Sequence, residues 1–170
     1  MQDASQVHII PYRDENHLAL IQPLIDKDLS EPYSIFTYRY FISQWPHLCF
    51  LAMNKEQCVG AVVCKLESHK HYIMRGYIAM LVVRHDCRKL GLGSKLVSTA
   101  IEAMIASGCH EVTLEAEVTN IAALRLYQNL GFIRDKRLEK YYLNGNDAFR
   151  LKLRLQSTPK LRNLNYQGYI

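Results

Sequence analysis

Apolar residues recur at helical spacing in four segments of the chain. Residues 17–29 carry leucine and isoleucine on one face, and residues 34–44 form a second, tyrosine-rich segment. Pro23 lies inside the first pattern, so we expect that helix to kink or restart there. The clearest apolar stripe covers residues 91–106, and another covers residues 120–130. The pattern therefore predicts four helices.

Other segments are continuously apolar or alternate between apolar and polar residues, as β-strands do. A polar triplet between the first two of them predicts a hairpin. Along the chain, two helices precede a run of strands, which is followed by a helix, a strand, a helix and the final strands. This order predicts an α/β fold with a mixed central sheet flanked by helices. The predicted strands are residues 48–53, 57–66, 73–83, 111–118 and 149–155.

Length and composition are typical of a single folded domain. The chain has 170 residues, of which 49% are hydrophobic and 22% are charged. It has no apolar run of the ~18 residues that would span a bilayer, and its first residues do not resemble a signal peptide. The five cysteines are scattered and form no Cys-x-x-Cys pair, so we expect reduced thiols in a cytoplasmic protein. The net charge of +5 favours anionic partners, such as a phosphorylated cofactor, RNA or a ribosome surface, without choosing among them.

A basic, glycine-containing turn joins the strand ending at Val83 to the helix of residues 91–106. A helix start exposes unpaired N–H groups, and glycines let a large anion approach them, so the turn is suited to a pyrophosphate. A P-loop is excluded because Ser94 precedes Lys95 and Arg88 stands where the first glycine belongs. A dinucleotide fingerprint is excluded because Leu96 replaces its third glycine.

The turn instead reads Arg-x-x-Gly-x-Gly, with Arg88, Gly91 and Gly93, and it resembles the acetyl-CoA loop of the GCN5-related N-acetyltransferase (GNAT) superfamily. Residues 120–132 resemble the second cofactor element of that superfamily, Asn-x-x-Ala-x-x-x-Tyr-x-x-x-Gly-Phe. On pattern alone, the first turn could also be a simple helix cap. The resemblance implies a single GNAT domain that uses acetyl-CoA as cosubstrate and no metal. It implies that the cofactor contacts are Leu81, Val82, Val83, Arg88, Lys89, Leu90, Gly91, Leu92, Gly93, Ser94, Asn120, Ala123 and Tyr127.

A narrower resemblance covers nearly the whole predicted fold. Residues 28–35, 38–41, 44–46, 75–78, 114–118 and 141–144 are similar to the catalytic subunits of NatC N-terminal acetyltransferases. The resemblance implies acetylation of nascent proteins that begin with methionine followed by a bulky hydrophobic residue. It also implies two partners, a large auxiliary subunit that anchors the enzyme to the ribosome and a small Sm-like subunit, and no membrane.

The match extends over residues 7–155, which we predict to be the acetyltransferase domain. Residues 156–170 lie outside it and are expected to be a C-terminal tail that is flexible or docks on a partner.

Two residues carry the implied chemistry. Glu115 and Glu117 alternate with apolar residues, so both acids should point to one face of the sheet. By resemblance, Glu115 is the general base, acting through a water, although two exposed carboxylates would give the same pattern. The resemblance also implies that Tyr127 assists the departing thiolate, and that the backbone of residues 81–83 supplies a donor to the oxyanion.

Substrate contacts are expected from a loop between the first two helices and from scattered tyrosines. The chain has 11 tyrosines and 5 phenylalanines, a composition suited to a groove that grips peptide backbone and apolar side chains together. Within this set Glu31 is expected to pair with the incoming ammonium or to hydrogen-bond the peptide. The predicted substrate-binding residues are Leu29, Glu31, Pro32, Tyr33, Tyr77, Tyr141 and Tyr142.

Other interpretations stay open at this point. A related acetyltransferase acting on lysine or a small amine would share both cofactor elements, and a nucleic-acid-binding module would also use basic residues and tyrosines. His69 and His71 have no evident third partner, so we expect no metal site there. Cys87 borders the basic turn, which would lower the pKa of its thiol.

Overall fold

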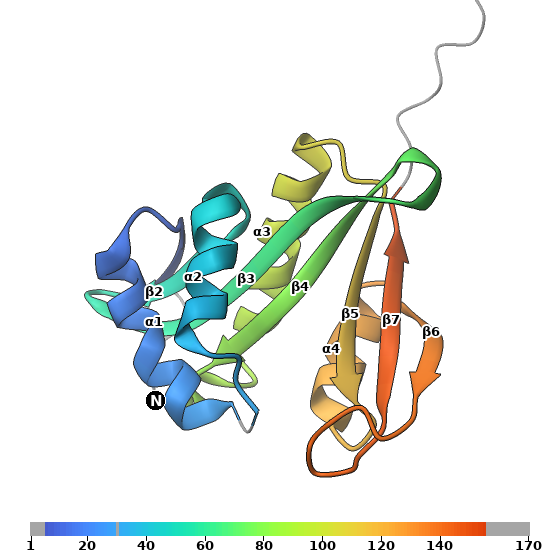
Figure 1. Ribbon diagram of the computed structural model, residues 1–170. Helices are drawn as coiled ribbons and strands as arrows, with labels where there is room; N and C mark the ends of the chain where they lie inside the picture. The colour runs from blue at the N-terminus through green and yellow to red at the C-terminus, as the bar shows by residue number, and fades with distance from the viewer. Residues whose placement is uncertain (1–5, 30, 156–170) are drawn as a thin grey trace, which may run out of the picture.

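The computed structural model describes residues 6–29 and 31–155, and these form a seven-stranded sheet covered by helices on both faces (Figure 1). The strand order is β1-β2-β3-β4-β5-β7-β6, in which only β4 and β5 run parallel. The predicted mixed α/β sheet is therefore confirmed. The strands are β1 (Val7–Pro11), β2 (Phe50–Asn54), β3 (Gln57–His69), β4 (Ile73–Val83), β5 (Glu111–Glu117), β6 (Ile133–Leu138) and β7 (Ala148–Arg154).

All four predicted helices are present. They are α1 (Glu15–Asp28), α2 (Ile35–Gln44), α3 (Leu92–Ala106) and α4 (Ile121–Asn129). Helix α1 continues through Pro23 as a single helix, so the expectation that it would restart there was wrong, whereas a kink at Pro23 stays a prediction. Buried residues on both sides of Pro23, among them Ile21 and Leu24, hold the two halves of the helix against the sheet.

Two hydrophobic clusters occupy opposite faces of the sheet. Helices α1 and α2 pack on the face toward the viewer, and α3 and α4 lie behind the sheet (Figure 1). Strand β3 contributes to both clusters because its side chains alternate: Val62 and Cys64 join the cluster of α3, whereas Ala61 and Val63 join that of α1 and α2. This double burial explains why residues 57–66 read as a nearly continuous apolar run.

Strands β4 and β5 are paired over a short distance only. Their register covers Arg75–Tyr77 against Glu111–Thr113, and the two strands separate beyond it (Figure 1). The ladder between β3 and β4 shifts where Val63 faces Met80 and Cys64 faces Ile78, so Ala79 is an extra residue on β4. Because β4 and β5 are paired only as far as Tyr77, the rest of β4 has no partner strand on the side that faces β5.

Two strands were not predicted as separate elements. Strand β1 lies at one edge of the sheet, and β6 lies at the other edge with almost every side chain exposed. The sequence of β6 carries a run of charged residues and no apolar alternation, so its position in the sheet comes from pairing with β7. The predicted C-terminal tail, residues 156–170, lies outside the described residues. Within the described ranges, no helix is long and apolar enough to cross a bilayer.

Truncation of Leu96 should test the core between α3 and the sheet. Leu96 is fully buried, so Leu96→Ala is expected to lower the free energy of unfolding by about 2–5 kcal/mol, measured by urea titration. Ile105→Ala, on the same helix at a position that is 53% exposed, is the matched control and should change it by less than about 0.5 kcal/mol. Equal losses in the two variants would contradict this packing.

The cysteines should resist alkylation in the folded protein. Burial raises the pKa of the Cys87 thiol, so the expectation of a lowered value was wrong. Burial also raises the pKa of Cys58 to about 11 and that of Cys49 to about 12. Intact-mass measurement after iodoacetamide treatment near neutral pH is expected to show no label until denaturant is added. Rapid labelling of the native chain at Cys87 would contradict this expectation.

Candidate active site

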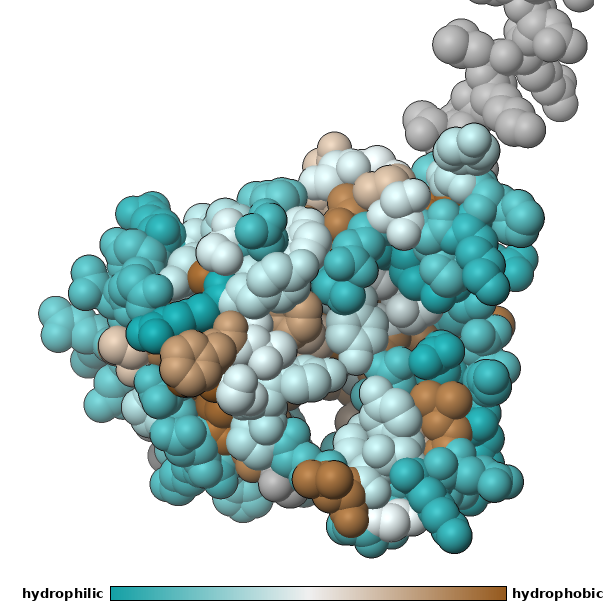
Figure 2. All heavy atoms as spheres, in the orientation of Figure 1, coloured by the Kyte–Doolittle hydropathy of each residue, from teal (hydrophilic) through white to brown (hydrophobic). Residues whose placement is uncertain are grey.

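A cleft of about 240 Å³ lies where β4 and β5 separate. Its walls come from these two strands, from α4 and from two loops, one between α1 and α2 and one between β6 and β7. Figure 2 shows an opening in the lower part of the molecule, in the region that lies between these loops in Figure 1. A larger hollow of about 620 Å³ lies between α4 and β6, and none of the predicted site residues lines it.

The cleft gathers residues that are far apart in the sequence. Most predicted substrate residues and both predicted catalytic residues line it, whereas Pro32, Val82, Val83 and the turn of residues 88–94 do not. The predicted residues in its lining are Leu29, Glu31, Tyr33, Tyr77, Leu81, Glu115, Asn120, Ala123, Tyr127, Tyr141 and Tyr142.

Glu115 is the centre of a hydrogen-bonded chain across the sheet. Its side chain is only 9% exposed. The Tyr77 hydroxyl donates to Oε2 at 2.6 Å, while Arg150 donates to Oε1 from Nε at 3.2 Å and from Nη2 at 3.1 Å. The Tyr33 hydroxyl lies 3.4 Å from that of Tyr77 and extends the chain to the loop after α1. Glu115 is therefore a largely buried, paired carboxylate, and the alternative of a solvated surface acid does not apply to it.

The phenol of Tyr77 stays protonated in this arrangement. Burial, together with its hydrogen bond to the Glu115 carboxylate, raises the pKa of Tyr77 well above its ordinary value. The neutral phenol is thus the donor in the hydrogen bond that it shares with Oε2 of Glu115.

Glu117 lies on the same face of β5 but serves the loop between β6 and β7. Its Oε1 accepts hydrogen bonds from the side chains of Asn144 and Asn146, and also from Thr119. The contact with Asn146 is the main cause of the lowered pKa of Glu117. These bonds anchor the loop to the end of β5, so the two acids that look equivalent in the sequence have different surroundings.

Glu31 joins the two loops that border the cleft. Its carboxylate accepts the backbone N–H groups of Leu143 at 3.3 Å and of Asn144 at 3.2 Å. The carboxylate thus lies at the cleft rim with part of its hydrogen-bonding capacity already used within the protein. Direct contact between Glu31 and a substrate stays a prediction.

Tyr127 lies on the opposite wall of the cleft from the two loops. Its ring is buried, it packs edge-on against Phe132 with the centroids 5.3 Å apart, and burial raises the pKa of its hydroxyl. Within the described part of the chain, the hydroxyl makes no hydrogen bond, and the residue lines the cleft. The ring is thus packed in the core while a protonated hydroxyl is available to a ligand.

The start of α3 leaves backbone donors available. Asp14, Ser34 and Asn120 cap the other helices through their side chains, whereas Gly91 at the start of α3 has no side chain to do so. Lys89 and Gly91 both have positive φ, which turns the basic loop over this helix end. A Cβ at Gly93 would come within 2.8 Å of Leu126 on α4, so the glycine lets the two helices approach each other closely.

Two residues that shape the site, Tyr38 and Arg150, were not among the site residues predicted from the sequence. Tyr38 accepts a hydrogen bond from the backbone N–H of Tyr33 at 3.1 Å and thereby shapes the loop after α1. Arg150 faces Glu115 directly in the ladder between β5 and β7. Strand register is not visible in the spacing of residues, so no sequence signal marked this pair. Among the described residues, no group of three His, Cys, Asp or Glu side chains is placed to hold a metal ion.

Comparison with known proteins identifies the family of the chain. The model of the acetyltransferase (GNAT) family matches residues 18–132. The chain is 60% identical over 151 residues to N-alpha-acetyltransferase MAK3 of Arabidopsis thaliana, covering 89% of this chain and 79% of the relative. It is 59% identical over 150 residues to N-alpha-acetyltransferase 30 of Xenopus laevis, covering 88% of this chain and 55% of that relative.

A solved structure gives the same assignment. A chain in the crystal structure of the NatC complex bound to Gag peptide and CoA superposes with a TM-score of 0.85 at 46% sequence identity, covering 89% of this chain and 99% of the other. With the family model, the relatives and the shared fold in agreement, the chain belongs to the GNAT acetyltransferase family and, within it, to the N-alpha-acetyltransferases typified by MAK3 and N-alpha-acetyltransferase 30.

Proposed function

We propose that this chain is the catalytic subunit of a NatC-type enzyme. It transfers acetyl from acetyl-CoA to the α-amine of nascent proteins that begin with methionine followed by a bulky hydrophobic residue. The observation that carries the proposal is the cleft between β4 and β5, which has Tyr127 on one wall and the Glu115–Tyr77 pair on another.

The residues present fit acetyl-CoA. The α3 N-terminus has no side-chain cap, and Arg88, Lys89 and Lys95 add positive charge beside it, which suits a diphosphate. The edge of β4 beyond Tyr77 has no partner from β5, so its free backbone groups suit the amide-containing arm of the cosubstrate. When bound, acetyl-CoA supplies the thioester that is attacked.

The amine is activated with modest help from the protein. An α-amino group has an ordinary pKa of about 7.7–8.0, so a fraction is already neutral at neutral pH. Glu115 takes the proton that the attacking nitrogen loses, through a water, and passes it to solvent. Tyr77 donates to the same carboxylate and fixes the orientation of Oε2.

The remaining roles follow from position. Backbone N–H groups at the free edge of β4 stabilise the negative charge that develops on the carbonyl oxygen. The Tyr127 hydroxyl donates its proton to the departing sulfur as the carbon–sulfur bond breaks, and it is reprotonated from solvent afterwards. The tyrosines at the rim, Tyr33, Tyr141 and Tyr142, hold the first residues of the peptide.

The partners and location are part of the same proposal. Likeness to a chain of the NatC complex supports a large auxiliary subunit that anchors the enzyme to the ribosome and a small Sm-like subunit. Because nascent chains emerge there, we place the enzyme in the cytoplasm beside the ribosome.

Acetyl-CoA should stabilise the folded chain. At a concentration about 100 times its Kd, a ligand that binds only the folded state adds about 2.7 kcal/mol, which is readily seen as a higher Tm in a thermal shift assay. Acetyl-pantetheine, which lacks the diphosphate, is the control and should give a much smaller shift because α3 then has no anion to bind. Equal shifts from the two compounds would contradict the assignment of the α3 N-terminus.

The substrate class is tested with peptides. Full-length protein with acetyl-CoA should acetylate a peptide that begins Met-Leu, and mass spectrometry should place the acetyl group on the α-amine. Glu115→Gln is expected to lower kcat by about 10²–10⁴-fold with little change in acetyl-CoA affinity. Glu67→Gln, an exposed acid on the same face of the sheet, is the control and should leave kcat unchanged. Acetylation of an internal lysine in place of the terminus would favour the lysine acetyltransferase alternative instead.

A further inference from the structure

A second hollow reaches Glu115 from the side away from the cleft. It also measures about 240 Å³, and it shares Tyr77 and Glu115 with the cleft as a common wall. Its other walls are polar and include Arg75, Thr113 and Arg150. The Arg150 side chain is one-third exposed, so its guanidinium faces solvent on one side and the Glu115 carboxylate on the other.

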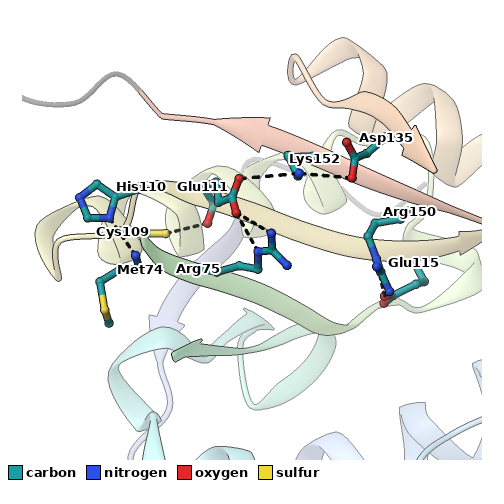
Figure 3. Close-up of polar contacts among 9 residues, drawn as sticks. All are labelled: Met74, Arg75, Cys109, His110, Glu111, Glu115, Asp135, Arg150 and Lys152. Carbon is teal, nitrogen blue, oxygen red and sulfur yellow. Dashed lines mark hydrogen bonds and ion pairs between the residues drawn. The ribbon is translucent and has the colours of Figure 1, made fainter. Parts of the chain in front are cut away.

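Arg150 is the cation that forms an ion pair with Glu115. Its two N–H donors converge on Oε1, and the Tyr77 hydroxyl occupies Oε2, so both oxygens have fixed partners. The neighbouring cations are used elsewhere (Figure 3): Arg75 pairs with Glu111 at 2.7 Å, and Lys152 pairs with Asp135 at 3.2 Å. The strand register places Arg150 directly opposite Glu115, so no loop movement is needed to form the pair.

We infer that Arg150 is a positioning residue for the acetyl transfer. It acts through Glu115, holding the carboxylate in one orientation with two N–H donors on Oε1, and it does not touch the reacting atoms. The physical reason is that a carboxylate with so little exposure is costly to leave without a counter-ion. Without Arg150, the Glu115 side chain would lose its fixed orientation and turn toward solvent, which takes the base out of position in the cleft. This inference rests on the role of Glu115 proposed above.

The test removes the guanidinium group of Arg150 by mutation and then supplies free guanidinium ion in solution. Arg150→Ala, in the assembly in which the wild-type chain acetylates a Met-Leu peptide, is expected to lower kcat by about 100-fold while the KM for acetyl-CoA stays unchanged. Because the hollow opens to solvent, added millimolar guanidinium should restore part of kcat. Arg150→Lys, which keeps the charge without the two-pronged contact, should lie between wild type and Arg150→Ala.

Two controls separate positioning from a general effect. Lys152→Ala removes a cation two residues along the same strand that pairs with Asp135 and Glu111, so its kcat should stay near wild type and should not respond to guanidinium. Glu115→Gln should not be rescued either, because it lacks the carboxylate that guanidinium would orient.

The inference and the proposed function fail in different ways. A wild-type chain that cannot acetylate the Met-Leu peptide overturns both. An active wild type with an equally active Arg150→Ala variant overturns the inference alone, as does a loss of kcat that guanidinium does not reduce. If Arg150→Ala does not fold, Arg150→Lys decides, because a kcat equal to wild type would show that the two-pronged contact has no role.

Discussion

The brief pairing of β4 with β5 is the constraint on which the active site depends. The two strands share a register over three residues and then separate, and the extra residue Ala79 lies on β4 just beyond the last paired position. In a continuous sheet, the backbone groups of both strands would be used in the ladder and Tyr127 would face packed protein. Separation turns a strand edge inside the molecule into a place where an amide-containing ligand can be held, without opening either hydrophobic cluster.

The polar face of the sheet gives this cleft its electrostatic character. Two acids on β5 each meet a cation on a neighbouring strand: Glu111 pairs with Arg75 on β4, and Glu115 pairs with Arg150 on β7 (Figure 3). Glu111 and Glu115 illustrate the difference that location makes. Glu111 lies where β4 and β5 are still paired and is part of a structural network, whereas Glu115 lies beyond the separation and faces both the cleft and its counter-ion. The same residue type on the same strand thus has two roles.

Much of the fold could be predicted because its helices and inner strands carry strong apolar patterns. The cofactor turn was also recognisable, since glycine spacing and positive charge are local properties of the sequence around Gly91 and Gly93. The strand β6 and the continuity of α1 through Pro23 were not predictable from pattern, because tertiary packing decides both. The pairing of Glu115 with Arg150 could not be predicted either, because it depends on tertiary structure. Arg150 is 35 residues away in the chain, and only the register of β5 with β7 brings the two side chains together.

The contact between Glu31 and the far loop has a consequence for how this protein can vary. The Glu31 carboxylate accepts hydrogen bonds from backbone N–H groups 112 and 113 residues away in the chain. It therefore links the loop between α1 and α2 to the loop between β6 and β7, and these two loops border the cleft. A change in the length of either loop would displace the other loop as well. Peptide preference in such a fold therefore changes more readily when side chains are exchanged in loops of constant length. Insertion or deletion of residues in one loop is less readily accommodated.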